Sequence, residues 1–370
     1  MKSVETPLIG TTGAASSRLA TLGALLCAAL LLWLGAWIYW PGISGPELLD
    51  DRSSVLVIGD LKKRPELALD YIVGDKSGAL GRSVSMTSFV LEKMYLDEGI
   101  VGNKKVNIAL HLLNGALLIW LFWLLLRFIE VPGYRALAVL LGALWILHPL
   151  LVSTVLYVVQ RMAILATLFM LLASISYVYW RLRLIRGSAS VLHFMPVPLF
   201  FAVALLAKEN AVVLVPTLLL LEVWWFECRG QRGQVIVWLQ RASYGLIASG
   251  AVVLAMFALL RWEQLAGRFY RRPFSLTERL LTQSRVVWDY VSQSFHPQVA
   301  RMGIYHDDVV VSSSLFTPLS TLFAVLAWLL VIVLGAVLIR SRGGRWIAFG
   351  IGWFLLGHSV ESTVLPLEMY

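Results

Sequence analysis

The chain has 370 residues, of which 59% are hydrophobic and only 14% are charged, and its mean hydropathy is +0.77. A soluble domain of this length could not bury so much apolar surface, which excludes an ordinary globular enzyme and indicates a polytopic membrane protein. The net charge of +9 does not indicate nucleic-acid binding, because the basic residues lie in short segments between apolar tracts. The two cysteines predict neither a disulfide framework nor a metal site.

Apolar tracts of about 17–25 residues recur along the chain, each long enough to cross a hydrocarbon core of about 30 Å. The first tract is too long for a signal peptide, and we expect it to remain as an anchor. The predicted spans are 19–40, 106–126, 135–147, 162–180, 190–207, 211–226, 243–262, 317–339 and 346–360. We therefore expect an all-α protein with a cytoplasmic tail over 1–18 and a single transmembrane domain of about nine helices over 19–370.

The basic residues predict the orientation of these spans. Five clusters occur in the short segments: Lys2/Arg18, Arg127/Arg135, Arg181/Arg183/Arg186, Arg229/Arg232/Arg241 and Arg340/Arg342/Arg345. Short basic loops stay in the cytoplasm, so the N-terminus is predicted to be cytoplasmic. The segments then predicted outside are 41–105, 148–161, 208–210, 263–316 and the end of the chain after about His358.

Two interruptions follow from backbone chemistry. A single helix over 190–226 would measure about 55 Å, so we expect the chain to fold back at Lys208-Glu209-Asn210. Pro149 lacks an amide hydrogen and disfavours helix at His148, which predicts a break there and a short surface helix over 150–159. Spaced apolar residues also predict short interfacial helices in the first external loop, 41–105, and an amphipathic helix in "LTERLLTQSRVVWDYVSQSF".

Two pairs of carboxylates are predicted to lie outside the membrane. Asp50-Asp51 follows the first span, where a carboxylate can act as a general base or bind a metal, or can simply lie in a solvated turn. His306-Asp307-Asp308 has the chemistry of a divalent cation site, although Asp-Asp in an exposed loop is usually solvated. The sequence does not require a metal.

Two cations are predicted at the outer ends of apolar helices. Arg161, next to Gln160, has the planar fork that binds phosphate, and the alternative is snorkelling to the interface. Lys208, next to Glu209, places a second cation in a tight turn at the same predicted depth, and the alternative is a local ion pair. Polar groups at membrane depth are costly, which is why we treat these positions as candidates.

Other polar residues are predicted to support this site. Asn107, His111 and Asn114 share one helix face and are predicted mainly to join helices. His148 is predicted to fix the helix break by hydrogen bonding, with substrate contact as the second possibility. Glu361 follows the last predicted span on the outer side.

The order of these motifs resembles the membrane half of the GT-C glycosyltransferases. The shared stretches are the external Asp pair, "GRSVSMTSF", "NIALHLLNGALL", "HPLLVSTVLYVVQRM" and "LAKENAVVLVPTLLLL". They are most similar to the bacterial relatives of the tetratricopeptide-repeat transmembrane O-mannosyltransferases, over about residues 41 to 226. The repeats themselves are absent from this sequence.

The resemblance implies a GT-C-like bundle and a sugar donor linked to polyprenyl phosphate. It implies that Asp50 or Asp51 is the catalytic base and that Arg161 and Lys208 receive the donor phosphate. We expect transfer to a hydroxyl of a protein or glycan on the periplasmic side of a bacterial inner membrane, with membrane lipid but no nucleic acid as partner. Two alternatives stay open: a transporter or flippase for a lipid-linked or anionic solute, and a non-catalytic envelope scaffold.

Overall fold

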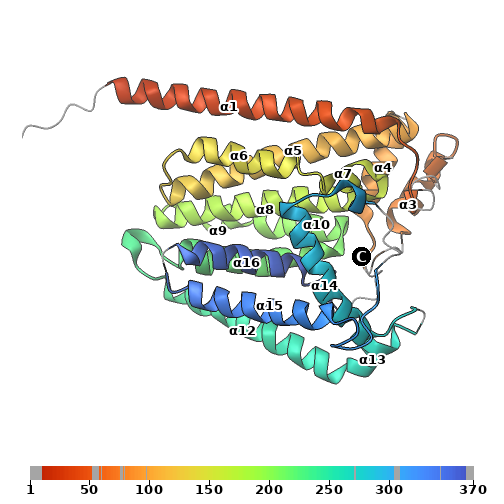
Figure 1. The fold of residues 1–370 in the computed structure, drawn as a ribbon. Coiled ribbons are helices and arrows are strands. Elements are labelled where there is room, and N and C mark those ends of the chain that lie inside the picture. Colours follow the sequence, from red (N-terminus) through yellow and green to blue (C-terminus); the bar gives the residue numbers. More distant parts are fainter. Residues whose placement is uncertain are drawn as a thin grey trace, which may run out of the picture. The chain divides into compact units, whose positions relative to one another are not determined.

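The computed structural model describes residues 11–51, 58–59, 61–75, 78, 80–96, 98–270, 272–303, 309–341 and 343–363. The candidate cation site at His306-Asp307-Asp308 lies outside the described residues. Helices make up 77% of the chain and no strand occurs in the described part, which confirms the all-α prediction (Figure 1). The chain divides into two compact units, Met1–Val178 and Tyr179–Tyr370.

Six helical segments in the described part of the chain are long and apolar enough to cross a membrane. They are Ser17–Ser44, Gly99–Phe128, Val158–Ile185, Glu209–Phe226, Val237–Phe257 and Ser320–Leu338. The other three predicted spans also coincide with helical segments, but these are shorter: Tyr134–Ile146, Val191–Ala207 and Gly344–His358. The count of nine spans therefore stays a prediction.

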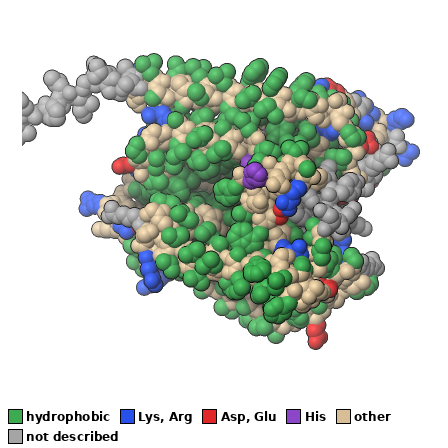
Figure 2. Space-filling view, in the orientation of Figure 1, with side chains coloured by type: hydrophobic (Ala, Val, Ile, Leu, Met, Phe, Trp, Pro, Cys, Tyr) green, Lys and Arg blue, Asp and Glu red, His purple; other side chains and the backbone are tan. Residues whose placement is uncertain are grey.

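The surface of the long helices matches a lipid environment. Large apolar side chains of the first helix, including Leu25, Trp33 and Trp37, are exposed, and hydrophobic side chains cover most of the face shown in Figure 2. Water would oppose such a surface, whereas lipid tails accommodate it.

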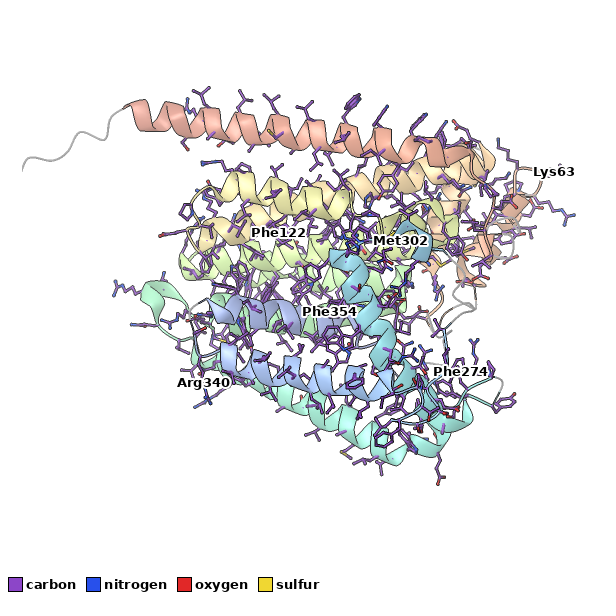
Figure 3. All side chains as sticks on the ribbon, viewed as in Figure 1. Lys63, Phe122, Phe274, Met302, Arg340 and Phe354 are labelled. Atoms are coloured by element: carbon purple, nitrogen blue, oxygen red, sulfur yellow. The ribbon has the colours of Figure 1, made fainter. Side chains whose placement is uncertain are left out.

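The first unit contains the first predicted external loop and the long helices that flank it. Its elements are α1 (Thr11–Tyr39), η1 (Trp40–Ser44), η3 (Pro65–Leu67), α3 (Ala68–Val73), α4 (Ser83–Tyr95), α5 (Gly99–Phe128), α6 (Tyr134–Ile146), α7 (Leu151–Leu156), η4 (Val158–Gln160) and the first part of α8 (Arg161–Ile185). The short helices of this loop, which spaced apolar residues had predicted, are present. The side chain of Lys63, in the same loop, points away from them (Figure 3).

Glycines allow α5 and α6 to pack closely. A Cβ atom on Gly115 would lie 2.4 Å from the side chain of Ile146, and one on Gly142 would lie 2.2 Å from that of Ile119. Helix α1 packs against the same pair, with Leu31 buried beside Ile119 and Ile146. Small residues at contacts of this kind are typical of helices that associate in membranes.

The predicted break at His148-Pro149 is present. Helix α6 ends at Ile146, and the backbone N–H of Leu150 donates to Nδ1 of His148 at 3.3 Å instead of continuing the helix. The carbonyl of Ile146 loses its helical partner in this way and accepts from other groups: Nε2 of His111 lies at 3.0 Å and the hydroxyl of Tyr39 at 3.3 Å.

The second unit begins inside α8 and contains the remaining helices. Its elements are α9 (Val191–Phe194), α10 (Pro196–Ala207), η5 (Glu209–Val213), α11 (Leu214–Leu221), the π-helical η6 (Glu222–Phe226), η7 (Gln231–Gly233), α12 (Val237–Leu260), α13 (Trp262–Gly267), α14 (Leu276–Phe295), η8 (Val299–Arg301), α15 (Ser320–Leu338) and α16 (Gly344–His358). The predicted turn at Lys208 and the predicted amphipathic helix α14 are both present.

Aromatic side chains join α14, α15 and α16. The rings of Trp288 and Trp328 stack at 4.5 Å, and each indole N–H donates to a backbone carbonyl of the other helix. Phe354 of α16, labelled in Figure 3, stacks on Trp328 at 6.2 Å. These half-buried indoles join the helices by ring contact and leave neither N–H group without an acceptor.

Candidate functional site

The two predicted catalytic aspartates lie side by side in the chain but in different environments. Asp50 is exposed, whereas Asp51 is 1% exposed. The carboxylate of Asp51 accepts the N–H of Val159 at 2.9 Å on one oxygen and the N–H of Leu48 at 3.1 Å on the other. Asp51 therefore fixes the first loop to the segment that leads into α8.

Lys104 of α5 holds the chain just before this pair and was not identified from the sequence. Its ammonium is buried and donates to three carbonyls, those of Gly45 at 2.7 Å, Pro46 at 3.2 Å and Gly42 at 3.4 Å. The same positive charge acts on Asp51. A buried ammonium with all three hydrogens directed at one loop fixes the position of that loop.

The pKa of Asp51 is raised above its ordinary value of 3.8. Burial raises it, while the N–H groups of Val159, Leu48 and Val158 and the charge of Lys104 act in the opposite direction. A carboxylate of this kind is a stronger base than an exposed aspartate, because its charged form is less well solvated.

Tyr157 connects the exposed aspartate to the same segment. Its hydroxyl accepts the backbone N–H of Asp50 at 3.0 Å. Burial raises the pKa of Tyr157, and the charges of Asp50 and Asp51 raise it further, so the phenol stays protonated at neutral pH.

Arg161 is 0% exposed and lies at the centre of a polar network. Its guanidinium donates to the side chain of Asn107 at 2.9 Å, to Asn103 at 2.9 Å and to the carboxylate of Glu92 at 3.1 Å. It also lies 4.3 Å from the ring centroid of Phe89. Nη1 is buried and makes no hydrogen bond within the described structure. The sequence predicted a phosphate-binding group here. In the structure the guanidinium is enclosed and paired with Glu92, so a phosphate could reach Nη1 only by entering this buried network.

The polar stripe of α5 joins this helix to the segment around α8. Asn107 donates to the carbonyls of Tyr157 and Val158 at 3.4 and 3.3 Å, and Asn114 donates to that of Ile164 at 2.9 Å. His111 is buried and stacks on Trp145 at 4.8 Å. Asn103 lies four residues before Asn107 on the same face of α5, so the helical spacing could have identified it. It accepts from Arg161 and in this way also joins α5 to α8.

The supporting residue Gln160 and the break residue His148 lie on either side of α7. Gln160 is half-buried and ends η4 directly before Arg161, where its N–H donates to the carbonyl of Tyr157 at 3.1 Å. The ring of His148 accepts the Leu150 N–H described above. In the structure, both residues take part in shaping the chain between α6 and α8.

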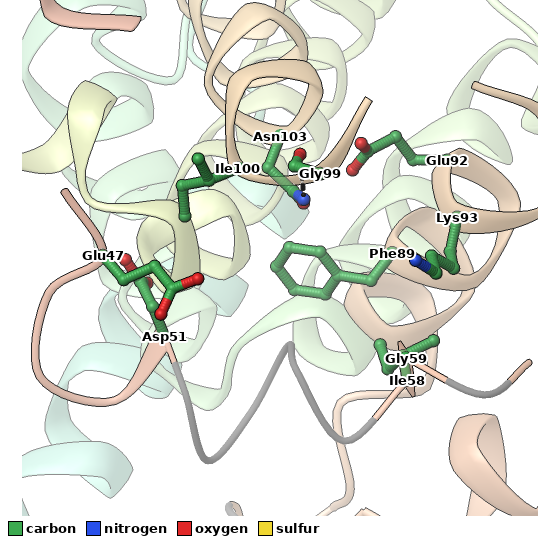
Figure 4. A pocket seen from close by; sticks show the side chains of 10 residues that line it. All are labelled: Glu47, Asp51, Ile58, Gly59, Phe89, Glu92, Lys93, Gly99, Ile100 and Asn103. Carbon is green, nitrogen blue, oxygen red and sulfur yellow. Dashed lines mark hydrogen bonds between the residues drawn. The ribbon is translucent and has the colours of Figure 1, made fainter. Parts of the chain in front are cut away.

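A small cavity of about 60 Å³ lies between the Asp51 segment and helix α4 (Figure 4). Glu47 and Asp51 form one side, Glu92 and Lys93 of α4 contribute to the opposite side, and the ring of Phe89 lies between them. The volume holds about two water molecules, or a single hydroxyl-bearing group. Within the described residues, no group of three or more His, Cys, Asp or Glu side chains is placed to hold a metal ion.

The second unit brings together three other predicted residues. Lys208 lies in extended conformation between the end of α10 and the start of η5, so the cation lies at the predicted interruption. The ammonium of Lys208 lies 3.5 Å from the carboxylate of Glu361, which follows α16. The side-chain amide of Asn210 donates to the same carboxylate. Asn210 and Glu361 are 151 residues apart in the sequence, so no local sequence pattern could predict this contact.

A buried ion pair in the second unit was not predicted. Arg181 had been assigned to a cytoplasmic basic cluster, yet it is 0% exposed and donates to Glu222 at 2.6 Å and to the carbonyl of Arg229 at 2.9 Å. Glu222 begins the π-helical turn, and Glu227 and Cys228, which follow that turn, have φ angles of 51° and 52°. Both the π turn and the positive φ values are rare for ordinary residues.

Comparison with known proteins gives no match: no family model, no curated protein and no solved structure matches this chain.

Proposed function

We propose that this protein is a membrane glycosyltransferase of the GT-C type that uses a sugar linked to polyprenyl phosphate. The observation that carries the proposal is the setting of Asp51. It follows the first membrane-type helix, lines a cavity and has a raised pKa. The order of the motifs along the sequence supports the same class.

Asp51 is the proposed catalytic base. Its oxygens accept the N–H groups of Val159 and Leu48 and interact with that of Val158, which leaves one of the about four lone-pair positions of a carboxylate for an acceptor hydroxyl. The hydroxyl oxygen attacks the anomeric carbon, its proton passes to Asp51, and the bond between that carbon and the phosphate oxygen breaks. A direct displacement of this kind inverts the anomeric centre.

Lys104 would then prepare the base, whereas Asp50 would not act as one. Lys104 fixes the loop before Asp51, and its charge limits the rise in the pKa of Asp51. Asp50 is exposed, so its charge is screened by water and it is the weaker candidate for the base.

Lys208 is the proposed contact for the phosphate of the donor. Its side chain is 20% exposed, whereas Arg161 is fully enclosed. A preorganised cation stabilises the negative charge that develops on a leaving phosphate. We assign Arg161 to holding α4, α5 and α8 in position.

The test is complementation of a strain that lacks this chain, read by mass spectrometry of surface glycans and envelope proteins. We expect the strain to lose a sugar modification, and the wild-type gene and Asp50→Asn to restore it. Asp51→Asn should restore about 10²–10⁴-fold less, the usual contribution of a general base. Equal amounts of each variant in the membrane are the control. Full restoration by Asp51→Asn would contradict the assignment of the base.

A transporter or flippase for a lipid-linked or anionic solute is the second candidate. The buried Arg181–Glu222 pair and its π-helical turn favour it, because buried charges on the predicted cytoplasmic side are typical of solute pathways. Arg181→Met with Glu222→Met removes both charges together. A transporter should lose function in this double variant, whereas a periplasmic transferase should keep it.

A further inference from the structure

Two donors of one turn converge on a single carboxylate oxygen in the second unit. The ammonium of Lys208 lies 3.5 Å from Oε1 of Glu361, and the amide of Asn210 donates to the same oxygen. Charge-assisted donors arranged in this way recognise carboxylates and phosphates alike, since both present anionic oxygens. The turn is therefore an anion site that a side chain of the protein itself occupies.

The backbone that carries Glu361 is fixed independently of this contact. Arg279 of α14 is 1% exposed and donates to the carbonyls of Glu361 at 2.9 Å and Thr363 at 3.2 Å. The hydroxyl of Thr363 also donates to the carbonyl of Ser359 at 2.8 Å. The turn after α16 therefore keeps its shape whether or not the carboxylate contacts Lys208.

The side chain of Glu361 is much freer than its backbone. It is 54% exposed, whereas the anchoring Arg279 is buried. An ion pair that water reaches is weak, and a long side chain gains rotamer freedom when it leaves the pair. The carboxylate can move off Lys208 without disturbing the fold.

We infer that Glu361 is an internal competitor, whose carboxylate holds the anion site of Lys208 and Asn210 until a phosphate group of the lipid-linked donor displaces it. This inference rests on the proposed function for the role of Lys208, and it adds the regulation of that site. The competitor keeps the cation paired between turnovers, and it weakens the binding of the donor phosphate.

The experiment measures binding of polyprenyl phosphate, which carries no sugar, to the full-length protein in detergent, with inorganic phosphate as a separate ligand. Glu361→Gln removes the charge but keeps an oxygen that accepts from Asn210. We expect this variant to bind polyprenyl phosphate roughly three- to tenfold more tightly than the wild type. Lys208→Ala should bind about tenfold or more weakly. Glu263→Gln changes an exposed carboxylate of α13 in the same way and is the matched control, with unchanged affinity.

Unchanged or weaker binding by Glu361→Gln would overturn the inference, because a competitor cannot be removed without a gain. Wild-type binding by Lys208→Ala would overturn it as well. Tighter binding of both ligands by Glu361→Gln supports a site for the phosphate group alone. Tighter binding of polyprenyl phosphate only supports a site that also recognises the lipid. Thermal unfolding of each variant checks that the fold is intact, and Glu361→Ala repeats the test if Glu361→Gln unfolds early.

The outcome is separable from that of the proposed function. If Asp51→Asn loses sugar transfer but Glu361→Gln gains no binding, the proposed transferase function is supported and the role of Glu361 as a competitor is contradicted. If Glu361→Gln gains phosphate binding but the protein transfers no sugar, the role of Glu361 as a competitor is supported and the transferase function is contradicted.

Discussion

The guanidinium of Arg161 and the carboxylate of Glu92 meet at 3.1 Å, although the two side chains are 0% and 5% exposed. Both charges are largely removed from bulk water, so each depends on the other, and Arg161 also depends on Asn103 and Asn107. The pair joins α4, in the first loop, to the start of α8. It fixes one wall of the cavity beside Asp51.

Removing Glu92 should therefore destabilise the protein strongly. Glu92→Ala leaves the charge of Arg161 buried without a counter-ion, which costs about 3–5 kcal/mol in comparable pairs. We expect a drop of several degrees in the midpoint of thermal unfolding, measured in detergent.

The matched control is Glu98→Ala. Glu98 forms an ion pair with Lys105 at 2.5 Å, but both side chains are well exposed. Such a pair contributes about 0–1 kcal/mol, so this variant should unfold close to the wild type. Equal stability of the two variants would show that the Arg161–Glu92 pair contributes little.

The rate of the proposed sugar transfer should depend on the ionisation of Asp51. Because burial raises the pKa of this carboxyl above 3.8, kcat/KM should rise with pH through a midpoint above that value. The measurement is a pH profile of transfer by the purified protein. A midpoint at or below 3.8 would point to an exposed carboxylate such as Asp50.

The same shift predicts the sign of a stability effect. A carboxyl whose pKa is raised by folding stabilises the folded state most below pH 3.8, and this contribution is lost as the pH rises through the raised pKa. The free energy of unfolding of the wild type should therefore fall over this window relative to that of Asp51→Asn. If the free energies of unfolding of the wild type and of Asp51→Asn change in parallel with pH, the raised pKa of Asp51 is contradicted.

Lys104→Met should move the pH profile upward. The charge of Lys104 lowers the pKa of Asp51, so removing it should raise the midpoint of the acidic limb. The neighbouring Lys105→Met removes an exposed charge and serves as the control. A loss of activity without any shift of the midpoint would reduce Lys104 to a purely structural role.

Close packing of α5 and α6 gives a prediction that does not depend on function. A Cβ on Gly115 would lie 2.4 Å from Ile146, so Gly115→Ala should destabilise the protein by about 1–3 kcal/mol through overpacking. The double variant Gly115→Ala with Ile146→Ala opens space for the added methyl group. Its stability should exceed the value expected if the two changes were independent.

Gly245→Ala in α12 is the corresponding control. A Cβ at this position would meet nothing within 4 Å, and alanine is the better helix former. We expect equal or slightly greater stability, by about 0.4–1 kcal/mol. A similar loss in Gly115→Ala and Gly245→Ala would contradict the overpacking argument.

The sequence by itself determined the helices and their interruptions. Long apolar tracts predicted the positions of α1, α5 and α15, because length and hydropathy are local properties. The break at Pro149 followed from its missing amide hydrogen, which also acts locally. The amphipathic pattern of 276–295 predicted α14 for the same reason.

The tertiary structure alone decided which polar residues are enclosed and what they contact. Asp50 and Asp51 are equivalent in the sequence, yet only the contact of Asp51 with Val159 buries one of them. Arg161 was expected to bind phosphate at the outer end of a helix, and Glu92, 69 residues earlier, pairs with it instead. Burial and pairing depend on segments far apart in the chain, and the free energy of a charge depends on what surrounds it. No local pattern contains that information.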